Sequence, residues 1–132
     1  MWNGADLVEP ATGAFSSMGD VTFIGQRTVL VEAGGRRVQW SGVADPTSLD
    51  GLDFATTESR DDNNFRASPV GGALAIFKEQ SIEMWSQTST GLQAIPNYTI
   101  DRGLKARNLM AEVPQGVFMV GNDNRAYIMT SG

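Results

Sequence analysis

The feature of this sequence that most constrains its fold is an internal repeat of about 45 residues. Trp40-Ser41 recurs as Trp85-Ser86, 45 positions later, and a third apolar run of the same kind ends near Met129. Each unit has the same order of short apolar runs, bends and polar turns, which is typical of antiparallel strands. We expect second strands at 28–31, 73–77 and 117–120, third strands at 37–41, 82–86 and 126–130, and fourth strands at 52–56 and 92–98.

A period of about 40–50 residues with three or four strands per unit is that of β-propeller blades. We therefore predict an all-β chain of antiparallel, four-stranded, blade-like sheets, related to a β-propeller and holding about two to three blades. The 15 glycines fit such a turn-rich chain. We expect an N-terminal hairpin or partial blade at 1–20 and blades at about 21–62, 63–107 and 108–132.

This number of blades leaves the stack open, because closed propellers take about 4–8 blades and each blade needs a neighbour on both faces. Three explanations remain open. The chain is part of a larger protein, it completes itself by oligomerising or docking, or it is a small sandwich with a blade-like pattern. In each case aromatic residues are the expected filler between sheets; these are Trp40, Phe77, Trp85, Phe118 and Tyr127.

Composition excludes several functions. The sequence has no Cys and no His, so it offers no disulfide, thiolate site or imidazole chemistry. A net charge of −5 argues against sequence-independent nucleic-acid binding. The densest basic segment, 102–107, could touch a DNA backbone or an acidic partner, but we expect a solvated loop. Without an apolar run of about 18 residues we expect no membrane span, and the first residues do not resemble a signal peptide.

The acidic residues are the remaining candidates for chemistry. Asp45, Asp50, Asp53 and Glu58 could offer oxygen ligands to Ca²⁺, but their spacing is not that of an EF-hand loop and suits turns. Glu58 and Asp101 could form a two-carboxylate pair for glycoside hydrolysis. They lie 43 positions apart, close to the repeat length, which favours a repeated structural bond. We therefore expect no catalytic, cofactor-binding or metal-binding residue, no cofactor and no enzyme activity. The residues expected to recur structurally are Trp40, Trp85, Glu58, Asp101, Asp45 and Asp53.

Residues 40–59 read WSGVADPTSLDGLDFATTES. This segment resembles the pattern W-S-x-x-x-D-P/A-T-x-x-D-x-L-D-F-A-T/S-A/T-E of the packaged-DNA stabilisation proteins, the tail-hub or nozzle proteins of short-tailed phages. Residues 75–85 and 100–103 are similar, in the same order, to that family's L-W-L-F-G-x-x-S-T-E-x-W and I-E-R-G runs. The resemblance covers about residues 20 to 121. Members of the family are much longer, so we expect 132 residues to hold only part of that architecture.

The resemblance implies a structural virion protein of the phage tail or head–tail junction, made in the cytoplasm of the bacterial host. Its partners would be other tail or portal proteins and further copies of itself in a ring that seals the packaged genome. DNA would pass through without specific binding, and like charge would keep the duplex from adhering to an acidic wall. The alternative from another class is a receptor- or carbohydrate-binding propeller fragment, with or without glycan hydrolase activity.

Overall fold

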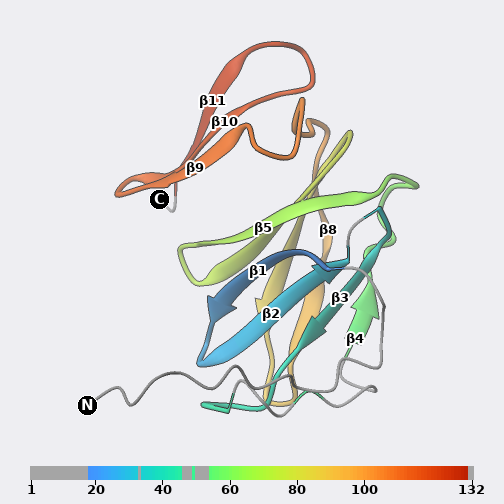
Figure 1. Cartoon of the computed structure of the whole chain (residues 1–132), viewed down its shortest axis with the longest axis vertical. Coiled ribbons are helices and arrows are strands. Elements are labelled where there is room, and N and C mark those ends of the chain that lie inside the picture. Colours follow the sequence, from blue (N-terminus) through green and yellow to red (C-terminus); the bar gives the residue numbers. More distant parts are fainter. Residues whose placement is uncertain (1–17, 33, 46–48, 50–53, 131–132) are drawn as a thin grey trace, which may run out of the picture.

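A computed structural model describes residues 18–32, 34–45, 49 and 54–130, and over these residues it contains eleven strands and no helix (Figure 1). Three antiparallel sheets follow one another along the chain. Sheet 1 is β1 (Met18–Ile24), β2 (Arg27–Glu32), β3 (Arg37–Trp40) and β4 (Phe54–Thr56); sheet 2 is β5 (Asn64–Val70), β6 (Ala73–Lys78), β7 (Ile82–Gln87) and β8 (Leu92–Ile100); sheet 3 is β9 (Met110–Val113), β10 (Gly116–Val120) and β11 (Ala126–Thr130).

The predicted all-β fold class is confirmed, and three open sheets fit a partial propeller. The predicted second and third strands are present, with bounds within two residues of those expected. The part of the predicted N-terminal hairpin at 1–17, together with Asp50 and Asp53, lies outside the described residues. No helix suited to crossing a membrane was found in the described part of the chain.

Each sheet begins with a hairpin closed by a turn of two residues. The last ladder pairs are Ile24 with Arg27 in sheet 1, Val70 with Ala73 in sheet 2 and Val113 with Gly116 in sheet 3. In the first of these turns Gly25 and Gln26 both have positive φ, at 57° and 62°, as a type I′ hairpin turn requires. These turns give a common starting point from which positions in the three sheets can be compared.

Sheet 2 is the central layer of the stack, because it is covered on both faces. Leu74, Ile76 and Trp85 belong to a core shared with sheet 1, whereas Ala75 and Phe77 belong to a core shared with sheet 3. Every residue from Leu74 to Lys78 is buried as a result. A strand buried on both faces reads as a continuous apolar run, which explains the sequence ALAIF.

Sheets 1 and 3 are covered on one face only by the described residues, and their strands alternate accordingly. In β2, Val29 and Val31 are buried against sheet 2, with less buried residues between them. In β10, Val117 and Met119 are buried against sheet 2, while Phe118 between them is 47% exposed. Among the described residues, sheets 1 and 3 therefore each have one outward-facing surface.

The first strands of the three sheets lie next to one another. The Asp20 carboxylate in β1 accepts hydrogen bonds from the backbone N–H of Ala67 at 3.0 Å and from the Arg66 guanidinium at 3.3 Å, both in β5. The Ser68 hydroxyl of β5 in turn donates to Glu112 of β9 at 3.0 Å. Side chains on successive first strands thus join one sheet to the next along a single line, as expected of blades that share an axis.

Candidate functional site

The contact between sheets 1 and 2 is built around two tryptophans. Trp40 ends β3 and Trp85 lies in β7, the third strand of each sheet, and both side chains belong to the core between these sheets. The indole of Trp40 lies against Gly91 in the β7–β8 turn, where an added Cβ would overlap the ring. Gly91 therefore lets the tryptophan of one sheet approach the backbone of the next. The Nε1 of Trp40 is buried without a hydrogen-bond partner among the described residues.

A buried ionic network lies at the end of sheet 2 where β6 leads into β7. The Lys78 side chain is completely buried and its Nζ lies 2.9 Å from Asp62 Oδ1, 3.9 Å from Glu83 Oε2 and 2.8 Å from the carbonyl oxygen of Arg60. Glu83 also accepts a hydrogen bond from the indole N–H of Trp85 at 2.9 Å. Each charge in the network therefore has partners on several sides, which buried charges require.

This network attaches the connection between sheets 1 and 2 to the β6–β7 end of sheet 2. Asp62 accepts hydrogen bonds from the backbone N–H of Gln80 at 2.8 Å and from the Ser81 hydroxyl, and Glu83 accepts one from the backbone N–H of Ser59. Burial by itself raises the pKa of Asp62. The hydrogen bonds and the positive charge of Lys78 outweigh burial, so its pKa lies below the ordinary value of 3.8. Asp62 is therefore held in its charged form as a structural anchor.

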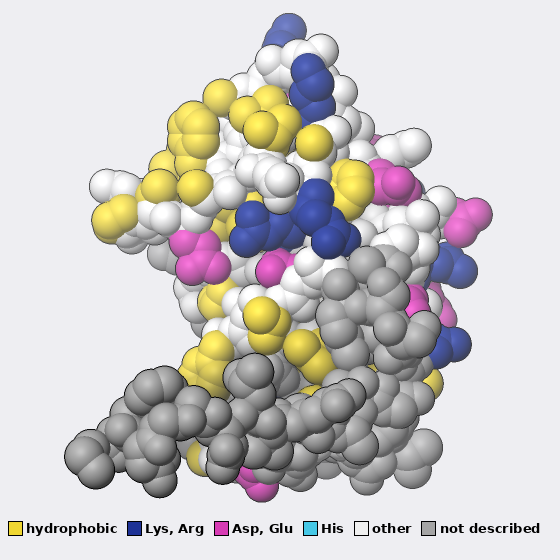
Figure 2. All heavy atoms as spheres, in the orientation of Figure 1, with side chains coloured by type: hydrophobic (Ala, Val, Ile, Leu, Met, Phe, Trp, Pro, Cys, Tyr) yellow, Lys and Arg dark blue, Asp and Glu magenta, His cyan; other side chains and the backbone are white. Residues whose placement is uncertain are grey.

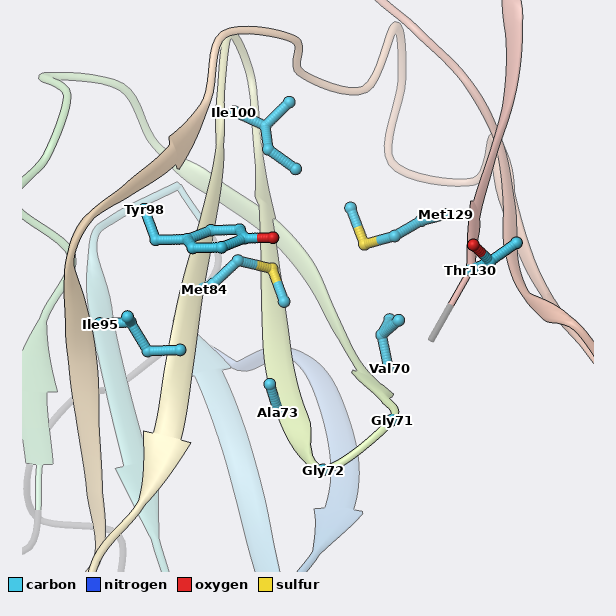
Figure 3. Close-up of a pocket in the computed structure, with 10 residues that line it drawn as sticks. All are labelled: Val70, Gly71, Gly72, Ala73, Met84, Ile95, Tyr98, Ile100, Met129 and Thr130. Carbon is cyan, nitrogen blue, oxygen red and sulfur yellow. The ribbon is translucent and has the colours of Figure 1, made fainter. Parts of the chain in front are cut away.

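An open groove of about 470 Å³ separates sheet 2 from the edge of sheet 3 (Figure 3). Ile95, Tyr98 and Met84 line it from sheet 2, and Met129 and Thr130 line it from β11. The Tyr98 ring extends over Met84 with its hydroxyl toward β11. Sheets 1 and 2 have a fourth strand beyond the third, whereas β11 is the last strand that the described residues contribute to sheet 3. The groove is therefore open where a fourth strand of sheet 3 would cover β8.

The segment 102–107 differs from the solvated loop that we expected. Leu104 is buried, and its backbone N–H donates to the carbonyl of Lys78. Arg107 donates to the backbone carbonyl of Gly19 at 2.9 Å, which ties the start of sheet 3 to the first strand of sheet 1. Lys105 is exposed, as predicted for this segment. The prediction was wrong for Gly103 and Leu104, which are buried between sheets 2 and 3, and holds for the exposed Lys105 and Ala106.

A second polar contact holds the β10–β11 turn. The Tyr127 hydroxyl donates a hydrogen bond to the Asp123 carboxylate, which raises the pKa of Tyr127 and lowers the pKa of Asp123. The guanidinium of Arg102 lies 3.7 Å from the same carboxylate. Asp123 therefore joins sheet 3 to the segment that leads out of sheet 2.

The structure separates the acids that the sequence singled out. Glu58 and Asp101 are exposed, and Asp101 pairs with Arg60 at 2.9 Å. Asp45 is exposed and forms an isolated bridge with Gly42. Asp53 lies outside the described residues. That Glu58 and Asp101 recur at equivalent positions stays a prediction. The two tryptophans lie one position apart in their sheets, because Trp40 pairs with Val29 and Trp85 pairs with Leu74. Over the described residues, no group of three or more acidic side chains is arranged to hold a metal ion.

Sequence reasoning missed the residues that matter most for joining the sheets, namely Asp62, Lys78 and Glu83. One signal was available. Glu83 interrupts the otherwise apolar run from Ile82 to Trp85, and Lys78 directly follows the apolar run of β6. Charges inside strands that are buried on both faces need partners, so an ion pair between these two residues could have been predicted from the sequence.

The described polar side chains thus join successive sheets to one another, and the three open antiparallel sheets fit part of a β-propeller. The sequence model of the family described as "Bacteriophage P22 Gp10, beta-propeller" matches residues 1–129, nearly the whole chain. The chain therefore belongs to this family of phage structural proteins that stabilise packaged DNA. Comparison with curated proteins found no match.

Proposed function

We propose that this protein is a component of the phage tail at the head–tail junction, where copies form a ring that seals the packaged genome and connects the portal to the tail. The observation that carries this proposal is the family match over residues 1–129. The protein would be made in the cytoplasm of the bacterial host and incorporated into the virion tail. Its partners would be portal and tail proteins.

The polar contacts of the sheets support a structural role without enzyme activity. Asp62, Glu83 and Glu112 accept hydrogen bonds or ion pairs from protein groups that hold the sheets in place. A carboxylate that is fixed by such partners has little freedom to act as a general acid or base. The net charge of −5 supports passage of DNA without adhesion, because like charges repel.

The groove between sheets 2 and 3 is one place where the glycan-binding alternative can be weighed. Of the ten residues that line this groove, Tyr98 is the one aromatic residue, and the others are aliphatic residues, glycines, two methionines and Thr130. Specific recognition of a polar ligand needs several placed donors and acceptors. This lining therefore favours contact with protein over contact with sugar.

A depletion experiment tests the proposal. Particles assembled in the phage that encodes this chain, but without it, should package DNA and then lose it, and supply of the protein in trans should restore DNA retention. Encapsidated DNA is measured as nuclease-resistant DNA per capsid. Depleted particles that keep their genome as well as wild-type particles would contradict the proposal.

A further inference from the structure

The buried network at Lys78 is an unusual setting for charge. On the face of the molecule drawn in Figure 2, basic and acidic side chains reach the surface, where charges usually lie. The side chains of Lys78, Asp62 and Glu83 are instead 0%, 6% and 2% exposed. One ammonium group therefore shares a site that is almost closed to solvent with two carboxylates.

Lysine differs from arginine in such a site. A guanidinium stays protonated in proteins, whereas a buried ammonium readily gives up a proton and becomes a nucleophilic amine. The other ion pairs of the described residues, such as Arg66 with Asp20, all use arginine. Lys105, the second lysine of the sequence, is exposed. Lys78 is thus the one described lysine that meets a carboxyl group away from water.

The carboxyl group of Asp62 is held in place for attack by this amine. Lys78 Nζ lies 2.9 Å from its Oδ1. The other carboxyl oxygen, Oδ2, accepts hydrogen bonds from the backbone N–H of Gln80 at 2.8 Å and from the Ser81 hydroxyl at 3.1 Å. Two donors on one oxygen stabilise the negative charge that develops there when a nucleophile adds to the carboxyl carbon.

Glu83 does not depend on Lys78 alone. Its Oε2 lies 3.9 Å from Nζ, farther than the oxygen of Asp62. Glu83 also accepts hydrogen bonds from the indole N–H of Trp85 at 2.9 Å and from the backbone N–H of Ser59 at 3.3 Å. The charge of Glu83 therefore keeps two donors if Lys78 becomes neutral.

Condensation of the two groups conserves atoms and charge. One proton passes from the Lys78 ammonium to Oδ1 of Asp62, and the neutral amine adds to the carboxyl carbon Cγ through its lone pair. A second proton follows from the nitrogen to Oδ1, the bond between Cγ and Oδ1 breaks, and Oδ1 leaves as water. The product is an amide between Nζ and Cγ, with Oδ2 as its carbonyl oxygen. No oxidant, cofactor or second reactant takes part.

Burial and proximity both favour this condensation. It removes two charges that are costly to keep away from water, and the two groups are already in contact, which makes the reaction intramolecular. We propose that Lys78 and Asp62 form an isopeptide bond, which joins the segment between β4 and β5 covalently to β6. The bond forms within one chain and acts on no other substrate, so the inference goes beyond the proposed function and does not depend on it.

The ion pair between Lys78 and Asp62 is the reactant state. Burial raises the pKa of Asp62, but its hydrogen bonds and the charge of Lys78 hold this pKa below its ordinary value. The neutral acid that reacts is therefore rare, and the bond should form slowly. Freshly refolded protein contains the ion pair, and the stability of the ion pair is measured on protein whose mass is unchanged.

Mass spectrometry of the full chain tests the inference. Protein refolded from urea is incubated at neutral pH, and its intact mass is followed over days under denaturing conditions. A species that is lighter by the mass of one water molecule should accumulate in folded wild type and not in protein kept in urea. Trypsin should then release residues 61–66 joined to residues 67–102, because a modified Lys78 is no longer cleaved.

Two substitutions assign the chemistry. Lys78→Arg keeps the positive charge but has no reactive amine, so it should stay at full mass, whereas the matched control Lys105→Arg should react like wild type. Ser81→Ala removes one donor from Oδ2 and should slow bond formation about 100-fold, the effect of losing one donor to a developing oxyanion. Circular dichroism verifies that each variant is folded.

The wild-type mass decides the inference even where a variant does not fold. Folded wild type that keeps its full mass, or a loss of water that leaves cleavage after Lys78 intact, would overturn it. An equal loss of water in folded Lys78→Arg would also overturn it, because the dehydration would then lie elsewhere in the chain. None of these results bears on DNA retention, so the inference and the proposed function fail separately.

Discussion

Replacement of Lys78 by Met should destabilise the contact between sheet 2 and the segment that connects β4 to β5. Lys78 is completely buried, and its Nζ neutralises Asp62 at 2.9 Å and Glu83 at 3.9 Å while it donates to the carbonyl of Arg60 at 2.8 Å. Met has a similar length but no charge, so both carboxylates would stay buried without a counter-charge. Removal of one partner from a buried ion pair costs about 3–5 kcal/mol. A domain of this size has a total stability of about 5–15 kcal/mol.

The loss can be measured by urea unfolding of the full chain, followed by the fluorescence of the buried Trp85 and Trp40. The protein concentration is kept fixed, because self-association would also change the apparent stability. Lys105→Met is the matched control; Lys105 is exposed, so its replacement should change the free energy of unfolding by no more than about 0.5 kcal/mol.

A second substitution separates charge from packing. In the Lys78→Met background, Asp62→Asn should recover part of the lost stability, because a neutral amide at position 62 needs no counter-charge. A loss below about 1 kcal/mol in the single variant, or no recovery in the double variant, would refute the reasoning that uncompensated buried charge dominates this site.

Three further predictions concern other parts of the stack. The folded pKa of Asp62 lies below its unfolded value, so its contribution to the free energy of unfolding should be present above about pH 4 and be lost as the pH falls through the folded pKa. In urea titrations from pH 7 to pH 3, the free energy of unfolding should fall less steeply for Asp62→Asn than for wild type. An equal fall in both proteins would argue against this prediction. Gly91→Ala places a Cβ in the Trp40 ring and should cost about 1–3 kcal/mol, whereas Gly72→Ala, with no atom within 4 Å of the added Cβ, should be nearly neutral in the same thermal melts. Asp20→Ala removes the acceptor for Ala67 N–H and Arg66 and should lower the free energy of unfolding by about 1–3 kcal/mol. The control is Asp61→Ala, since the Asp61 side chain is 98% exposed and pairs with Arg36; this variant should lose about 0–1 kcal/mol. Equal losses of stability in the two variants would contradict the role of Asp20.

The strands could be predicted from the sequence because their period is local. Alternation in β2 and the continuous apolar run of β6 follow directly from whether a sheet is covered on one face or on two. Phe118 shows the limit of this reasoning. We expected it to fill the space between two sheets, but it points outward, since the pattern of β10 does not say which of its two faces meets sheet 2.

The tryptophan repeat shows a similar limit. Trp40 pairs with Val29 and faces sheet 2, whereas Trp85 pairs with Leu74 and faces sheet 1, so the two rings share one core from opposite sides. Counted from the two-residue turns, Met84 is the residue of sheet 2 that corresponds to Trp40. An offset of one residue reverses the face of a strand residue, and sequence spacing alone does not resolve it.

The polar contacts were the least predictable part. Asp62 and Lys78 are 16 positions apart, and Asp20 and Arg66 are 46 apart, so neither pair follows from a local pattern. They meet because the sheets stack, and the stacking depends on the register and on the length of each connection. The resemblance to a family was the part of the functional prediction that sequence alone supported best, and the match over residues 1–129 confirms it.

The position of this protein in the virion tests the central claim most directly. Cryo-electron microscopy of the phage that encodes it, reconstructed without imposed icosahedral symmetry, would locate the three-sheet stack in the particle. The account predicts copies arranged in a ring at the head–tail junction, in contact with the portal or with tail proteins. Particles in which the chain is absent from this junction would contradict the account.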